Sequence, residues 1–195
     1  MPAKTPDRRT ARTRTALMSA FVELMLTRGF PDVSVEDIVV RADVGRSTFY
    51  LHFRSKDDIL KQSLTRPSGG LAALVGQGVT AAALTALLEH FHSQRKLNRV
   101  FFAYPARAVW IRCLAELIEP RLTALLRAHC GSRSILPLPM IAAQIAESQI
   151  ALIANWLMSR NAAKADTVAE ALVAMTRANV EALLRQHTGS MATPA

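Results

Sequence analysis

The stretch from residue 46 to residue 56 is rich in side chains that donate hydrogen bonds or carry positive charge, and six of them are candidate contacts. They comprise two small hydroxyl residues, a phenol, an imidazole, a guanidinium and an ammonium, and no acidic residue lies between Gly45 and Ser55. Groups of this kind bind phosphates and base edges, whereas a carboxylate among them would repel a phosphate. The segment therefore predicts a surface that binds nucleic acid. Its members are Arg46, Ser47, Thr48, Tyr50, His52 and Lys56.

The residues that would indicate an enzyme or a metal site are not arranged as such chemistry requires. The sequence has no nucleophile elbow, no metal-spaced histidines or carboxylates and no phosphate-cradling glycine loop. His90 and His92 are too close in sequence to share one side of a helix. Neither Cys113 nor Cys130 belongs to a CxxC pair, so we expect reduced, apolar thiols. The sequence thus predicts a protein that is not an enzyme, with no metal and no cofactor.

The elements that position the six side chains are short helices around a tight turn. Helix one is expected from about residue 7 to residue 28, ended by Gly29. A second helix begins at Ser34, whose capping box includes Asp37, and ends near residue 42. A tight turn over Asp43-Val44-Gly45 follows, in which both Asp43 and Gly45 can adopt left-handed angles. A third helix then covers residues 46 to about 52. Two short helices packed on a longer one describe a helix-turn-helix, with Val44, Phe49 and Phe53 pointing inward.

The fourth helix is expected to open with a capping box at Ser55 and to stop before the sequence Arg66-Pro67-Ser68-Gly69-Gly70. This breaker divides the predicted chain into a DNA-binding domain, residues 1–66, and a helical domain, residues 67–195. Basic residues before Arg14 form an arm that leads into the first helix.

Residues 10–60 resemble the DNA-binding domain of the TetR/AcrR family of transcriptional regulators. The resemblance rests on Ser34–Ile38, on Arg41–Phe53 and on the Ser55-Lys56-Asp57 that follows. Asp43 and Gly45 depart from residues that are common in the family, which leaves the details of base contact open. The resemblance implies that Tyr50, His52, Lys56 and Ser34 face phosphates. It also implies that Arg46, Ser47 and Thr48 lie nearest the bases, and that Arg14 and the arginines before it touch the backbone or minor groove.

The second half of the chain is also expected to be helical, so the fold class is all-α. Helices are predicted from Thr80, at about 95–103, from Pro105 to near residue 131 with a kink or restart at Pro120, at about 137–159 and at about 164–185. The helix over 140–158 is apolar around most of its circumference, so one face needs a partner. Small residues there allow close helix approach. The resemblance implies a homodimer through a four-helix bundle, which would place two reading helices one DNA turn apart on a palindromic operator.

A small-molecule site is predicted among the central helices. Its candidate residues are Phe91, Phe102, Trp110, Cys113 and Gln144, with Phe101, Tyr104 and Met140 as further lining. Most of them also fit a simple core at helical spacing. Polar groups on a buried helix need partners, so Gln144 and Glu147 are expected to bond across the dimer or, as the alternative, to face the ligand.

The chain is strongly basic, with a formal net charge of +9, which attracts phosphates of nucleic acid or of an anionic membrane. Between Arg133 and Arg160 only Glu147 is charged, a run long enough to span a bilayer. The polar residues at its middle favour a helix buried in protein instead. Together with the lack of a signal-peptide pattern, this predicts a cytoplasmic regulator without membrane contact. The expected function is that of a repressor released from DNA by a small-molecule inducer. An enzyme and a membrane-associated helical protein are the alternatives.

Overall fold

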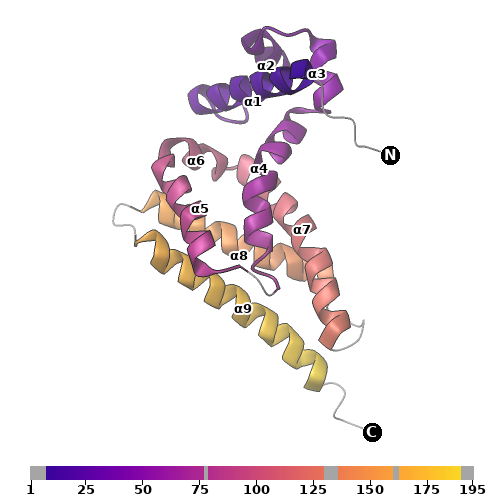
Figure 1. The fold of residues 1–195 in the computed structure, drawn as a ribbon, viewed down its shortest axis with the longest axis vertical. Coiled ribbons are helices and arrows are strands. Elements are labelled where there is room, and N and C mark those ends of the chain that lie inside the picture. Colours follow the sequence, from indigo (N-terminus) through magenta and orange to yellow (C-terminus); the bar gives the residue numbers. More distant parts are fainter. Residues whose placement is uncertain (1–7, 77–78, 130–135, 160–162, 190–195) are drawn as a thin grey trace. The chain divides into compact units, whose positions relative to one another are not determined.

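The computed structural model describes residues 8–76, 79–129, 136–159 and 163–189. Every regular element in these ranges is an α-helix and none is a strand, so the all-α prediction is confirmed (Figure 1). The chain divides into two compact units, Met1–Ser63 and Leu64–Ala195. Cys130 and Lys4, the one basic residue before Arg8 in the sequence, lie outside the described residues.

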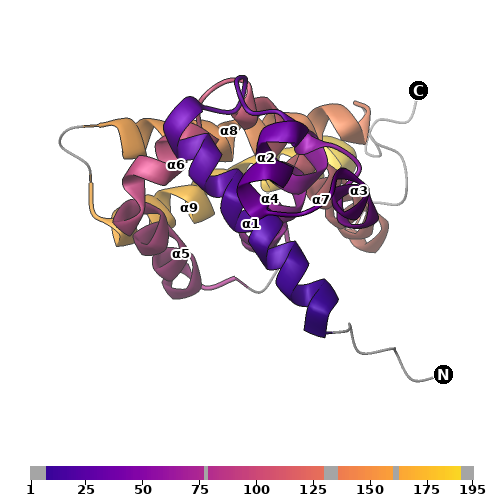
Figure 2. The same ribbon diagram turned by 90° about the horizontal axis from the view of Figure 1, so that it is seen from above.

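The helices of the first unit begin and end close to where the sequence predicts. They are α1 (Arg8–Arg28), α2 (Val35–Ala42), α3 (Arg46–His52) and the start of α4 (Lys56–Ala72). Gly29 ends α1 with a positive φ of 80°, a conformation that costs glycine little, and its N–H donates to the Met25 carbonyl at 3.0 Å. Figure 2 shows α2 beside α1, and α3 as the neighbour of α2.

Both ends of α2 are fixed by local hydrogen bonds. Ser34 and Asp37 form the predicted capping box, in which each side chain accepts from the other's backbone N–H. At the other end Asp43 has φ 54° and ψ 50°, so of the two residues that could take the left-handed conformation it is Asp43 that does, while Gly45 has φ −70°. The turn of the helix-turn-helix is therefore set by short-range chemistry that is visible in the sequence.

The core of the first unit is built from large apolar side chains of all four helices. The rings of Phe49 and Phe53 lie 5.7 Å apart and both are almost fully buried. Burying them orients α3, because its other faces are then turned outward. The most deeply buried members are Leu17, Phe21, Met25, Ile38, Phe49, Phe53, Ile59 and Leu60.

The predicted end of the fourth helix is wrong. Instead of stopping before Arg66, α4 continues through Pro67, Gly69 and Gly70 to Ala72. Tertiary contacts outweigh the poor helix propensity of these residues. Ser68 is fully buried and its Oγ accepts a hydrogen bond from Trp110 Nε1 at 3.0 Å. Leu71 and Ala72 are also fully buried, so stopping the helix earlier would expose apolar surface. The expected domain boundary after residue 66 falls inside α4, as does the division after Ser63.

The second unit contains the rest of α4 and the helices α5 (Ala81–Ser93), α6 (Arg95–Phe101), α7 (Ala106–His129), α8 (Leu138–Met158) and α9 (Ala165–Gly189). Their positions match the prediction, and Pro120 lies inside α7 without ending it. α7 packs chiefly on α8, α5 packs on α9, and α8 and α9 run side by side (Figure 1).

α8 is held on its own unit by apolar burial and by polar contacts. Ala142, Ala146 and Ala154 are nearly inaccessible, so small residues allow close packing within the chain. Gln149 is also buried, and its Nε2 donates to Thr176 Oγ1 on α9 at 3.0 Å. Among the described residues, no helix combines the length and the apolar character that crossing a membrane demands.

Candidate nucleic-acid interface

α3 turns its two kinds of side chain to opposite sides. Phe49 is buried in the core of the first unit, while Arg46, Ser47 and Tyr50 are exposed and Thr48 and His52 are half-buried. The side-chain hydroxyls of Ser47 and Tyr50 make no hydrogen bond with another described residue. The structure thus brings five of the predicted side chains together on one short helix, with hydroxyls available for a ligand.

One carboxylate lies close to this surface. Glu36, on α2, has its Oε2 3.9 Å from Arg46 Nη1, and both side chains are about two-thirds exposed. Such a long, solvated ion pair contributes little stability. The segment from Gly45 to Ser55 is free of acids, but the folded surface is not, because α2 supplies one. Glu36 could not be found from the residues adjacent to α3 in the chain, since it lies ten residues before Arg46.

Lys56 has bonds that the sequence did not predict. Its Nζ donates to the carbonyls of Phe30 at 3.0 Å, Pro31 at 3.1 Å and Val33 at 2.9 Å. It also lies 4.8 Å from the centroid of the Phe30 ring. The side chain is half-buried. An ammonium has three N–H donors, so all of them are engaged in this structure.

The hydroxyl of Ser34 is also engaged in hydrogen bonds within the chain. Its hydroxyl donates to the Asp37 carboxylate and accepts from the Asp37 N–H at 3.1 Å. Arg28 Nη1 approaches the same carboxylate to 2.7 Å. Hydrogen bonds from the Ser34 side chain and backbone, and then from Arg28, lower the pKa of Asp37 from 3.8 to about 2. Ser34 is exposed, but its single hydroxyl proton is not free for a phosphate.

Arg14 lies on the exposed side of α1, with its guanidinium carbon 5.8 Å from the centroid of the Phe53 ring. Arg8, Arg9 and Arg12 are also exposed, in the first turns of the same helix. A cation stacked on a buried ring keeps its donors outward. The beginning of α1 therefore adds positive charge to the first unit.

Leu51 lies on the exposed side of α3, where the sequence pattern predicts it, although it was not among the predicted DNA contacts. It is 83% exposed, and among the exposed large apolar residues of the described ranges only Tyr104, at 85%, is more accessible. The signal in the sequence was its place between Tyr50 and His52, where a core leucine would interrupt a polar face. An exposed leucine on such a helix can contact the methyl group of thymine.

Four of the five predicted ligand residues lie together in the second unit, in the core. The rings of Phe102 and Trp110 are 4.3 Å apart, and Phe91 lies 5.9 Å from the first and 5.8 Å from the second. Cys113 is buried one turn further along α7. Gln144 is exposed, so the structure does not place it with these buried groups. Tyr104 and Met140 are exposed as well.

A pocket of about 390 Å³ in the second unit is lined by other residues. They come from the segment between α4 and α5, from the end of α7 and from α9, and none was predicted from the sequence. The reason is that the pocket joins helices far apart in the chain. Its lining consists of Leu74, Gly76, Val79, Leu125, His129, Val173, Arg177, Val180, Glu181 and Leu184.

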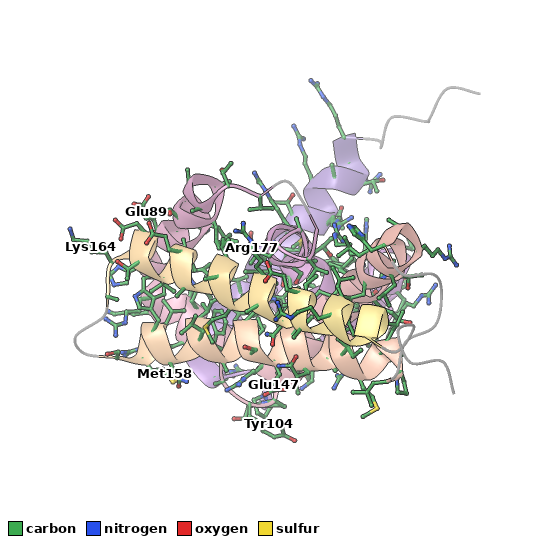
Figure 3. All side chains as sticks on the ribbon, turned by 90° about the horizontal axis from the view of Figure 1, so that it is seen from below. Glu89, Tyr104, Glu147, Met158, Lys164 and Arg177 are labelled. Carbon is green, nitrogen blue, oxygen red and sulfur yellow. The ribbon has the colours of Figure 1, made fainter. Side chains whose placement is uncertain are left out.

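Glu147 has a partner within its own chain. Its Oε1 lies 3.2 Å from Arg107 Nη2 of α7, and its side chain is 59% exposed. Figure 3 labels Glu147 and Met158 on α8 and Arg177 on α9. Glu147 was expected to need a partner across a dimer or in a ligand because its helix was predicted to be buried. The structure removes this reason, since Glu147 is exposed and pairs with Arg107 of its own chain. The buried polar residue of α8 is Gln149.

No three His, Cys, Asp or Glu side chains of the described ranges come together in a way that could hold a metal ion. The geometry instead defines a class of protein, an all-helical chain whose first unit is a helix-turn-helix with an exposed third helix. Residues 17–62 match the family described as bacterial regulatory proteins, tetR family. The match covers the helix-turn-helix unit, so this part of the chain is similar to the DNA-binding part of these regulatory proteins.

One curated protein is similar to part of the chain, and solved structures share its fold. The chain is 33% identical over 61 residues to the uncharacterized HTH-type transcriptional regulator YxbF of Bacillus subtilis, a match that covers 31% of this chain and only 16% of that protein. A TetR transcriptional regulator from Streptococcus agalactiae shares the fold with a TM-score of 0.58 and 24% identity, over 87% of this chain and 96% of that one. NalD of Pseudomonas aeruginosa, the secondary repressor of the MexAB-OprM multidrug efflux pump, has a TM-score of 0.54 and 23% identity, over 89% and 98% of the two chains.

Proposed function

We propose that this chain is a transcriptional regulator that binds double-stranded DNA through α3. The observation that carries the proposal is the division of α3 into a buried side, Phe49, and an exposed side with Arg46, Ser47 and Tyr50. A recognition helix needs this division, because it must be anchored to its own domain and still reach the major groove. Arg46, Ser47 and Thr48 would contact bases, while Tyr50 and His52 would hold phosphates.

The functional form is a homodimer on a palindromic operator. α8 and α9 lie side by side and present Met140, Met158 and Met175, each about half exposed. Exposed methionines on adjacent helices favour a partner of the same kind, and two such helix pairs form a four-helix bundle. A two-fold axis through that bundle would repeat α3 on both half-sites.

A small apolar molecule would regulate DNA binding from the second unit. The cluster of Phe91, Phe102, Trp110 and Cys113 supports an apolar ligand, but these side chains already pack on each other. Binding there would have to move them, and moving α5 to α7 is how a ligand could shift the population of DNA-binding states. The regulator would be a cytoplasmic repressor that the inducer releases, and the similarity to NalD, itself a repressor, supports this role.

Selection of bound sequences from a random pool of duplex DNA by the purified chain tests the function. A palindromic motif with two half-sites is expected, because a symmetric dimer reads the same sequence twice. The Arg46→Ala variant is the informative companion, since it should still bind DNA but select a less restricted motif. A bound pool whose sequences share no motif, or failure to bind duplex DNA at low salt, would overturn the proposal.

A further inference from the structure

Lys56 holds the loop between α1 and α2 through hydrogen bonds that use all three N–H donors of its ammonium group. Its ammonium is within 3.1 Å of three carbonyl oxygens, all from residues 30–33, and its position 4.8 Å from the Phe30 ring adds a cation–π contact. The structure assigns Lys56 the role of a positioning residue. We propose that it fixes this loop for DNA binding and does not itself neutralise a phosphate. This inference rests on the proposed function.

The loop that Lys56 binds is itself anchored in the core. Phe30 is 5% exposed and its ring packs edge-on against Phe21 at 6.3 Å, while Val33 is 1% exposed. The three carbonyl dipoles converge on one point, which is unfavourable unless a cation lies there. A phosphate could bind the ammonium only if at least one of these bonds were given up, leaving a carbonyl without its partner.

The loop leads directly to the residues that orient the helix-turn-helix. Ser34 follows Val33 and caps α2, and α2 in turn packs on α3. A displaced loop would therefore shift the start of α2 and, through it, the recognition helix. Lys56 lies at the first position of α4, so one side chain connects the α1–α2 loop to the helix that follows α3.

The salt dependence of DNA binding separates positioning from phosphate contact. Each phosphate that a protein neutralises adds about 0.9 to the slope of log K against log salt concentration. Lys56→Met, titrated against a mixed-sequence duplex, is expected to lower affinity at every salt concentration and to leave the slope unchanged. Arg14→Met removes the same charge at an exposed position and is expected to reduce the slope by about 0.9. A reduction of that size in Lys56→Met would overturn the proposal.

A second measurement uses the unmodified sequence, so it does not depend on whether Lys56→Met folds. In reductive methylation of the wild-type chain, Lys56 is expected to react more slowly than the exposed Lys96, equally with and without the duplex. Reaction of Lys56 at the rate of Lys96 in the free protein, with protection only in the complex, would show a phosphate-binding lysine instead. If the wild-type chain fails to bind the duplex at low salt, the proposed function fails, whereas the methylation rates of the free protein still test the bond set of Lys56.

Discussion

Ser34 and Asp37 close a reciprocal hydrogen-bonded ring at the start of α2, in which each side chain binds the backbone N–H of the other residue. This ring and Arg28 lower the pKa of Asp37 to about 2. The pKa of the folded state lies below that of the unfolded state, so the unfolded chain binds the proton more readily. The stabilisation is complete above about pH 4 and is lost as the pH falls toward about 2.

Asp37→Asn should therefore unfold at a lower urea concentration than the wild type near neutral pH, and the difference should shrink between about pH 4 and about pH 2. Urea midpoints recorded across this range by circular dichroism measure it. Ser34→Ala removes the largest cause of the pKa shift and should also flatten the pH dependence. Parallel curves for the wild type and Asp37→Asn would contradict this account.

Ser68→Ala should destabilise the second unit, because it leaves Trp110 Nε1 buried without its acceptor. The expected cost is about 1–3 kcal/mol, the usual penalty for an unsatisfied buried donor. Ser63→Ala is the matched control on the same helix, since Ser63 is half-buried and its hydroxyl donates only to the Leu60 carbonyl one turn back. Chemical unfolding followed by tryptophan fluorescence measures both variants. Equal losses would show that the Trp110 bond has no special importance.

Leu51→Ala should remove a preference for thymine. Burying one methyl group is worth about 0.8 kcal/mol, or roughly a fourfold change in affinity. The test uses a selected duplex whose thymines are replaced one at a time by deoxyuridine, which lacks the methyl group. The affinity of the wild type should fall by this factor at one position or more. The affinity of Leu51→Ala should be the same with thymine and with deoxyuridine at that position. Val40→Ala, which truncates a 72% exposed side chain on α2, should respond like the wild type. A wild type that is indifferent to every replacement would refute the contact.

Met175→Glu should dissociate the proposed homodimer, because it introduces a charge at an exposed apolar residue of α9. Sedimentation velocity is expected to show a dimer for the wild type and a monomer for the variant, with a matching loss of affinity for a palindromic duplex. Ala124→Glu introduces the same charge at an exposed position of α7 and should leave the dimer intact. A Met175→Glu protein that still sediments as a dimer would place the interface elsewhere.

The local features of the first unit were predictable from the sequence because local chemistry determines them. The Ser34 capping box, the left-handed Asp43 and the bounds of α3 agree with the structure. Long-range contacts were not predictable in the same way. The continuation of α4 past Pro67 brings Ser68 to Trp110, 42 residues further along the chain. The bonds of Lys56 depend on a loop 23 to 26 residues earlier.

In the predicted site, too, local features could be predicted from the sequence and long-range contacts could not. Periodicity identified the exposed side of α3, since Phe49 and Phe53 are apolar and their neighbours are not. It could not show that Glu36 approaches Arg46 or that the donors of Lys56 are already engaged. In the second unit, helical spacing identified Phe91, Phe102 and Trp110 as buried but could not place Gln144 on the exposed side of α8.

The continuity of α4 has a consequence for how the chain responds to proteases. A segment rich in proline and glycine normally invites cleavage, but residues 66–70 are wound into a helix with Ser68 and Leu71 inaccessible. A protease must unwind several turns before it can cut such a backbone. Brief digestion should therefore spare this stretch despite its composition, and nicking there would signal loss of the packing around Trp110.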